Sequence, residues 1–108
     1  MNVLLDELKN QSILVTGASD GIGREIARYL MQNGARVALH YNRNKKAAID
    51  LLKEFGSDGS EAFQADLGDA ENCLHLWDQV LNAFTKLDSV VLNAGVYQEH
   101  ATDEDDLK

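Results

Sequence analysis

Apolar and polar positions along the chain fall into blocks, and each block has the period of a strand or of a helix. Short apolar runs predict buried strands, whereas apolar residues spaced three and four positions apart predict amphipathic helices. The pattern predicts strands over about 12–16, 36–41, 61–65 and 88–93, and helices over about 21–33, 45–55 and 69–85. Strands and helices therefore alternate through most of the chain.

This alternation predicts the fold class. Strands joined by crossover helices build a parallel sheet, and right-handed crossovers determine where the helices lie on its faces. A switch point between the first and fourth strands then gives the strand order 3-2-1-4. We predict an α/β, Rossmann-like, doubly wound parallel sheet that is truncated after strand four, with strand four as a free edge.

Each predicted helix carries an apolar face that would pack on this sheet. The apolar positions are Ile22, Ile26, Ala27 and Leu30 in the first helix, Ala48, Leu51, Leu52 and Phe55 in the second, and Cys73, Trp77, Val80, Leu81 and Phe84 in the third. Gly34 and Gly56 are well placed to end the first two helices.

The two ends of the chain depart from this pattern. Residues 1 to about 11 form an amphipathic lead-in, and residues 102–108 resemble the start of a helix, with Thr102 as its cap and acidic residues in its first turn. A one-turn helix is not stable alone. We therefore expect residues 1–108 to be a half-domain whose last helix is cut off, with further chain after Lys108.

The composition disfavours several classes of function. The chain has 108 residues and a formal net charge of −8, which argues against binding to nucleic acid or to an anionic membrane surface. No apolar run approaches the roughly 18 residues of a membrane span, and the N-terminus lacks the features of a signal peptide. Cys73 is the single cysteine, so no internal disulfide can form, and we expect a reducing compartment, the cytoplasm.

The most informative stretch runs from Ile13 to Gly23. It predicts a buried strand, then a turn that contains Gly17 and Gly21, and then the start of a helix. The N-terminus of a helix directs unpaired N–H groups and the positive end of its dipole at whatever lies in front of it. This arrangement is typical of a phosphate-binding site.

Four features occur together on this frame of strands and helices. Thr16–Gly23 has the pattern T-G-x-x-x-G-x-G, the pair Asp66 and Leu67 follows strand three, Asp88 begins strand four, and an Asn-Ala-Gly turn (93–95) follows it. Together they resemble the short-chain dehydrogenase/reductase family over essentially the whole chain. The resemblance implies a dinucleotide-binding half-domain. It also implies hydride transfer between a nicotinamide cofactor and a carbonyl or alcohol substrate.

The resemblance assigns cofactor-binding roles to the glycine turn. Gly17 would allow the tight turn, Gly21 the approach of the pyrophosphate, and Gly23 the close packing of helix on strand. Ser19 and Ile22 would present N–H groups to phosphate.

The resemblance assigns further roles at two other strand ends. The positions are Asp66 and Leu67 after strand three, and Asn93, Ala94 and Gly95 after strand four. The aspartate would accept from the adenine amino group with the leucine against the ring, and the Asn-Ala-Gly turn would pass under the ribose nearest the adenine and the nicotinamide side. The alternatives are a helix cap ahead of Gly68 for the aspartate, and a backbone-bonding strand end for the asparagine. The family usually has two asparagines before Ala-Gly, whereas Leu92 occupies the first position here.

Cofactor choice depends on the residues after strand two, where the segment 40–44 contains no acid. An NAD site of this class has an acid about 20 residues past the glycines, which accepts from both ribose hydroxyls. Arg43 instead suits a 2′-phosphate, with Asn44 assisting, and the run His-Tyr-x-Arg resembles the corresponding loop of pteridine reductases, which use NADPH. Asp20 argues the other way, because its carboxylate would repel that phosphate. We predict NADP, with NAD as the alternative, in which case Arg43 would be a solvated loop residue.

No catalytic residue is assigned within the chain. The resemblance implies a Ser, a Tyr and a Lys four residues after the Tyr, all beyond strand four and past Lys108. Tyr41 and Lys45 have this spacing, but they lie at a strand end and a helix start and need not share a face. We predict no metal site, because the histidines lack partners at suitable spacing.

These observations combine into one expectation with alternatives. We expect the NADP(H)-binding portion of a short-chain dehydrogenase/reductase, inactive by itself. Its partners would be a dinucleotide and, in the full-length parent, a small carbonyl or alcohol substrate that the sequence does not identify. Any homo-oligomer would use the exposed edge and face. The alternatives are a stand-alone nucleotide-binding or regulatory module, and a truncated product without a function of its own.

Overall fold

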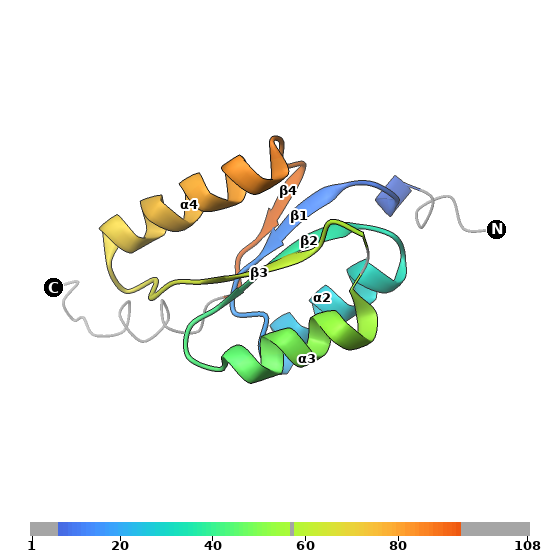
Figure 1. Ribbon diagram of the computed structural model, residues 1–108, viewed down its shortest axis with the longest axis horizontal. Coiled ribbons are helices and arrows are strands. Elements are labelled where there is room, and N and C mark those ends of the chain that lie inside the picture. Colours follow the sequence, from blue (N-terminus) through green and yellow to red (C-terminus); the bar gives the residue numbers. More distant parts are fainter. Residues whose placement is uncertain (1–6, 57, 94–108) are drawn as a thin grey trace, which may run out of the picture.

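The computed structural model describes residues 7–56 and 58–93 (Figure 1). Its elements in chain order are β1 (Ser12–Val15), α2 (Gly21–Gln32), β2 (Arg36–Tyr41), α3 (Lys45–Phe55), β3 (Glu61–Gln64), α4 (Ala70–Phe84) and β4 (Ser89–Val91). The predicted elements agree with these bounds to within about two residues at each end, which is the usual uncertainty of helix and strand ends. The predicted helix over 102–108 lies outside the described residues.

The strands form one parallel sheet in the order β3-β2-β1-β4. The predicted fold class and strand order are therefore confirmed. β1 is central, since Leu14 pairs with Ala38 on β2 and with Val90 on β4. All four residues of β1 are buried, which explains its continuous apolar run.

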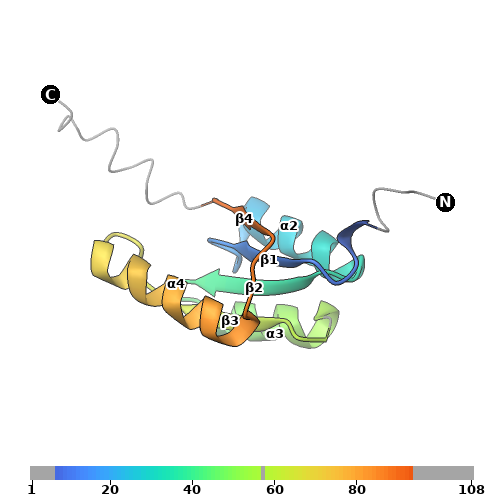
Figure 2. The same cartoon turned by 90° about the horizontal axis from the view of Figure 1, so that it is seen from above.

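The two faces of the sheet carry separate cores. In the described part of the chain, α2 and α3 lie on one face and α4 on the other (Figures 1 and 2). The core under α2 and α3 contains Ile13, Val15, Ala18, Ala27, Leu30, Met31, Ala35, Val37, Leu39 and Leu51. The core under α4 contains Leu14, Ala38, Phe63, Ala65, Leu67, Leu76, Val80 and Phe84. Neighbouring residues of a strand point to opposite faces, so β1 and β2 contribute to both cores.

Two residues that the pattern predicts on apolar helix faces are exposed. Ile22 is 71% exposed, because the adjacent Gly23 is the residue that faces inward. Trp77 is 41% exposed. The residues of α4 that are buried against the sheet are instead Leu76, Val80 and Phe84. The prediction was wrong at Ile22 and Trp77, since adjacent helical residues differ by about 100° in direction and only one of each pair can face the core.

Side-chain caps fix the start of two helices. The Asn44 Oδ1 accepts from the Ala47 N–H at 3.1 Å at the start of α3. The Asp69 Oδ1 accepts from the Glu71 N–H at 2.8 Å at the start of α4. Both helices therefore begin at defined residues, at the ends of the loops that follow β2 and β3.

Candidate functional site

The β1–α2 turn, residues 16–20, lies at the carboxyl end of β1. β2 and β4 flank β1 on its two sides, so the chain leaves this strand at the switch point of the sheet. Ligands of doubly wound sheets bind outside the carboxyl ends of the strands at this point. The turn is therefore where a ligand of this fold is expected.

Gly17 and Gly23 let three backbone segments meet at the turn. Gly17 has a φ of +62°, and a Cβ there would collide with the carbonyl oxygen of Asn93. A Cβ at Gly23 would collide with the carbonyl oxygen of Gly17 and with the Asn93 Nδ2. The first turn of α2 consequently packs directly on the β1–α2 turn and on the residue that follows Leu92 after β4.

Thr16 joins the same turn to β4 by hydrogen bonds. Its backbone N–H donates to the Val91 carbonyl oxygen at 3.0 Å, and its Oγ1 accepts from the Asn93 N–H at 2.7 Å. The Asn93 Nδ2 donates to the Gly17 carbonyl oxygen at 3.4 Å. Asn93 therefore bonds the backbone of the turn. No separate role for Thr16 was predictable from the sequence, because its partners lie more than 70 residues away.

Gly21 and the start of α2 face open space. Gly21 has a φ of +61°, and no atom lies within 4 Å of where its Cβ would stand. Asp20 is the N-cap residue in extended conformation, and its side chain makes no capping hydrogen bond. Ser19 is half-buried beside it and Ile22 is exposed. A phosphate group fits this end of the helix, since the N–H groups of a first turn lack partners within the helix.

His40 is a residue of this region for which the sequence pattern predicts no functional role. It is 3% exposed, and its ring spans two strand ends. The Gly17 N–H donates to His40 Nδ1 at 2.9 Å, and His40 Nε2 lies 2.8 Å from the Ala65 carbonyl oxygen. The Ala18 N–H donates to the His40 carbonyl oxygen at 2.8 Å. The feature of the sequence that could have pointed to His40 is its polar imidazole near the end of a predicted strand whose central residues, Val37 to Leu39, are apolar.

Arg43 and Asn44 occupy the β2–α3 loop, where both are exposed. The Arg43 carbonyl oxygen accepts from the Lys45 N–H at 3.0 Å, which tightens the loop ahead of α3. Asn44 caps α3 with its Oδ1, so this atom already has a hydrogen-bond partner. The loop thus presents one guanidinium group next to the carboxyl end of β2.

Asp66 and Leu67 follow β3 and have different surroundings. Asp66 is exposed, and its Oδ1 accepts from the Gly68 N–H at 3.0 Å. Leu67 is buried in the core under α4. The cap of α4 is Asp69 rather than Asp66. One carboxylate oxygen of Asp66 therefore orders the β3–α4 turn, while the side chain stays at the surface.

Comparison with known proteins decides the family. Residues 11–108 match the model of a protein family described as short chain dehydrogenase. The chain belongs to this family. The resemblance drawn from the sequence is thereby confirmed, and the family is one of oxidoreductases that use nicotinamide cofactors.

Curated relatives of this chain carry several different names. Versicolorin reductase from Emericella nidulans is 43% identical over 91 residues, 82% of this chain and 34% of the relative. A 3-oxoacyl-[acyl-carrier-protein] reductase from Staphylococcus aureus is 38% identical over 92 residues, 83% of this chain and 37% of the relative. Glucose and ribitol dehydrogenase from Daucus carota is 34% identical over 108 residues, 93% of this chain and 37% of the relative. The chain spans about a third of the length of these relatives.

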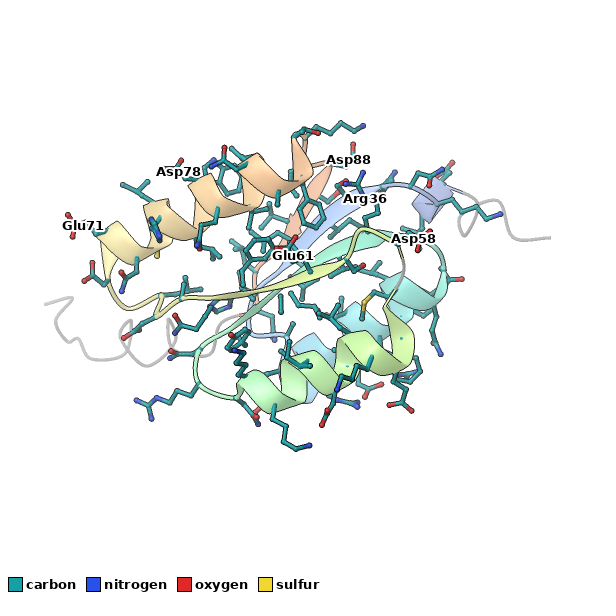
Figure 3. The ribbon with its side chains drawn as sticks, viewed as in Figure 1. Arg36, Asp58, Glu61, Glu71, Asp78 and Asp88 are labelled. Carbon is teal, nitrogen blue, oxygen red and sulfur yellow. The ribbon has the colours of Figure 1, made fainter. Side chains whose placement is uncertain are left out.

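Asp88, which contributed to the family resemblance, lies at the opposite end of the sheet from the glycine turn (Figure 3). Its Oδ2 accepts from the Ser12 N–H at 2.8 Å, and its own N–H donates to the Ser12 carbonyl oxygen at 2.8 Å. The Lys86 Nζ lies 3.2 Å from its Oδ1. The Ser12 N–H and Lys86 hold the pKa of Asp88 below its ordinary value. Asp88 thus joins the start of β4 to β1.

Three remaining predictions concern catalysis, metals and membranes. Tyr41 ends β2 and is buried, whereas Lys45 begins α3 and is exposed, so this Y-x-x-x-K pair lies on two elements. Among residues 7–56 and 58–93, no group of three His, Cys, Asp or Glu side chains is arranged to hold a metal ion. None of the helices in that same part of the chain has the length and apolar character needed to cross a bilayer. Ala94 and Gly95 lie outside the described residues.

Proposed function

We propose that this chain is the NADP(H)-binding portion of a short-chain dehydrogenase/reductase. The reaction of the whole protein would be hydride transfer between the nicotinamide and a carbonyl or alcohol substrate. The observation that carries the proposal is the open N-terminus of α2 beside Gly21, at the switch point of a parallel sheet. Helix dipole and unpaired N–H groups both favour a phosphate there.

The pyrophosphate would bind at this turn. Gly21 leaves room for it, because a Cβ at this residue would stand in the open space in front of α2. The N–H groups of Ser19 and Ile22 would donate to its oxygens. Gly17 and Gly23 act indirectly, since they keep the turn, α2 and the end of β4 in contact.

The adenosine end would extend toward the loops after β2 and β3. Arg43 is exposed at the end of β2 and would pair with the 2′-phosphate of NADP. Asn44 would assist through its amide nitrogen, because its Oδ1 caps α3. Asp66 would accept from the adenine amino group with its second carboxylate oxygen. Leu67, which belongs to the core under α4, would contact the adenine ring.

The preference for NADP over NAD rests on charge. The loop after β2 has Arg43 and no acid, so it lacks the carboxylate that accepts from both ribose hydroxyls in NAD sites. Asp20 is exposed at the N-cap of α2, and its carboxylate would repel the 2′-phosphate of NADP. We propose that Arg43 outweighs it, because a guanidinium group can make paired hydrogen bonds to a phosphate. The Asn93-Ala-Gly turn would pass under the ribose nearest the adenine and the nicotinamide side.

Catalysis would need residues that the chain does not supply. Tyr41 and Lys45 lie on separate elements, which supports the proposal that they do not act as the family's acid–base pair. The names of the relatives, two reductases and a dehydrogenase, favour carbonyl–alcohol interconversion without favouring one substrate. We propose that this chain binds dinucleotide weakly and does not turn over substrate by itself, and that it resides in the cytoplasm.

Calorimetric titration tests this function. NADPH, NADH and ATP would each be titrated into the chain, with circular dichroism to show that the sample is folded. The proposal expects NADPH to bind more tightly than NADH, and both to bind more tightly than ATP. Absence of binding by both dinucleotides in a folded sample would contradict it and would favour a product without nucleotide-binding function.

A further inference from the structure

The imidazole of His40 connects the glycine turn to the interior of the sheet. His40 lies on β2 opposite Phe63 of β3, and it shares the face of the sheet with Ala38, which packs under α4. Its ring contacts the Gly17 N–H on one side and the Ala65 carbonyl oxygen on the other. Three strand ends therefore meet at one side chain that is 3% exposed.

The two contacts fix the protonation of the ring. The Gly17 N–H is a donor, so His40 Nδ1 must accept and carries no proton. The Ala65 carbonyl oxygen is an acceptor, so Nε2 must donate and carries the proton. The neutral Nε2–H tautomer satisfies both contacts, whereas an imidazolium would direct a second donor at the Gly17 N–H.

Burial lowers the pKa of His40 from its ordinary value of 6.5, and the hydrogen bond to Ala65 opposes that shift in part. The ionisable side chains on the segments around the ring include Asp20 on the β1–α2 turn, Tyr41 and Arg43 after His40 itself, and Asp66 and Asp69 after β3. Those on α4 are Glu71, Cys73, His75 and Asp78. Among the described residues, His40 has no ion pair with any of these groups. Protonation of the ring would therefore place an uncompensated charge in the interior.

We infer that His40 is a positioning residue for dinucleotide binding, and that its neutral ring holds the Gly17 N–H so that the glycine turn keeps its phosphate-binding shape. This inference rests on the proposed function. It explains why Gly17 and Ala18, adjacent in the turn, both donate to the same residue. Affinity for the dinucleotide is then highest at pH values above the pKa of His40, where the ring is neutral, and it falls as the pH drops through that pKa.

Substitutions at His40 test the inference through the pH profile of binding. In His40→Asn the side-chain oxygen replaces Nδ1 as acceptor without a group that titrates, and His40→Leu removes the acceptor. NADPH affinity would be measured from about pH 8 to about pH 5, the range in which a histidine can titrate. The 2′-phosphate of NADPH itself titrates near pH 6, so each profile is read relative to wild type with the same ligand.

The expected profiles differ in shape. Wild type loses affinity toward acid more steeply than His40→Asn, which binds within about threefold of wild type near pH 8. His40→Leu binds about tenfold more weakly near pH 8. His75→Asn, the matched control on α4, keeps the wild-type profile. Superimposable profiles for wild type and His40→Asn overturn the inference, whether or not His40→Leu folds.

A second measurement separates this inference from the proposed function. Nitrogen-15 NMR of the ligand-free chain reports the tautomer of His40 and the amide shift of Gly17 as the pH falls. The inference expects an Nε2–H tautomer and a Gly17 amide that follows the titration of the ring. If wild type binds no dinucleotide, the proposed function fails while this result still decides the role of His40. An Nδ1–H tautomer, or a Gly17 amide that ignores the titration, overturns that role.

Discussion

Two loops at the carboxyl end of the sheet differ in how they are held. In the β1–α2 turn, Gly17 and Ala18 donate to His40, and Thr16 bonds the backbone of both Val91 on β4 and Asn93. In the β2–α3 loop, residues 42–44 are exposed. Its side-chain hydrogen bonds are the cap that Asn44 makes to its own helix and the bond that Gln64 Nε2 donates to the Asn42 carbonyl oxygen. One loop is fixed by the interior of the protein and the other projects its side chains outward.

This difference separates two kinds of recognition. A turn whose backbone is fixed can bind the pyrophosphate that all dinucleotides share, because the N–H groups are already in place. A loop with exposed side chains can distinguish one dinucleotide from another through charge, since changing Arg43 leaves the core intact. We therefore expect substitutions in the turn to change stability, and substitutions in the loop to change specificity.

The largest effect is expected at Gly17. Gly17→Ala adds a Cβ at a φ of +62° and drives it against the Asn93 carbonyl oxygen. We expect a loss of about 3 kcal/mol in the free energy of unfolding, from the left-handed backbone and the collision together. Urea denaturation measures it.

Gly21→Ala is the matched control. Its φ of +61° is nearly the same, but its Cβ would enter open space. The loss should be about 1 to 2 kcal/mol, the contribution of the backbone conformation alone. Equal losses of unfolding free energy in Gly17→Ala and Gly21→Ala would show that Gly17 does not pack against the Asn93 carbonyl oxygen.

The next effect is expected at Arg43. Arg43→Ala should weaken NADPH binding roughly tenfold, because a charge-assisted hydrogen bond to the 2′-phosphate is lost. NADH binding and the urea midpoint should stay near wild type, since Arg43 is exposed. Lys46→Ala removes a positive charge that is paired with Asp50 and should spare both affinities. Equal losses of NADPH and NADH affinity in Arg43→Ala would refute the assignment of the 2′-phosphate.

Asn44 tests whether one residue serves both stability and specificity. Asn44→Ala removes the cap of α3 and should cost about 1 kcal/mol of stability. Asn44→Asp keeps a capping oxygen and adds a negative charge, so the urea midpoint should hold while NADPH affinity falls. If Asn44→Asp binds NADPH like wild type, Asn44 does not approach the 2′-phosphate.

The smallest effect is expected at the pair of Lys46 and Asp50. The Lys46 Nζ lies 2.7 Å from the Asp50 Oδ2, one helical turn further along α3, and both side chains are more than half exposed. Asp50→Ala should change stability by less than about 0.5 kcal/mol, as is usual for such helix pairs. A larger loss would mean that the start of α3 depends on this pair as well as on its cap.

The sequence was sufficient for most of the fold, and the reason is physical. Strands buried on both sides need continuous apolar runs, and β1 and β2 have them. The helix phase was less certain: Leu76 and Trp77 are adjacent and both apolar, so only packing against the sheet shows which one is buried.

For the site, spacing and residue type were sufficient to bring the glycine turn, Arg43 and Asp66 to one end of the sheet. The contacts that hold the turn were not predictable in this way. His40 bonds residues 23 and 25 positions away, and Thr16 bonds Asn93, 77 positions away. Such pairs depend on the assembled sheet, and no local pattern in the sequence encodes them.

A titration followed by NMR separates binding of the shared pyrophosphate at the glycine turn from binding of the 2′-phosphate at Arg43. Amide and arginine side-chain signals of the chain would be followed by nitrogen-15 NMR as NADPH, and separately NADH, is added. We predict that the amide signals of Ser19, Gly21 and Ile22 shift with both ligands, and that the Arg43 side-chain signal shifts with NADPH alone. Shifts confined to α4, or identical shifts of Arg43 with both ligands, would contradict it.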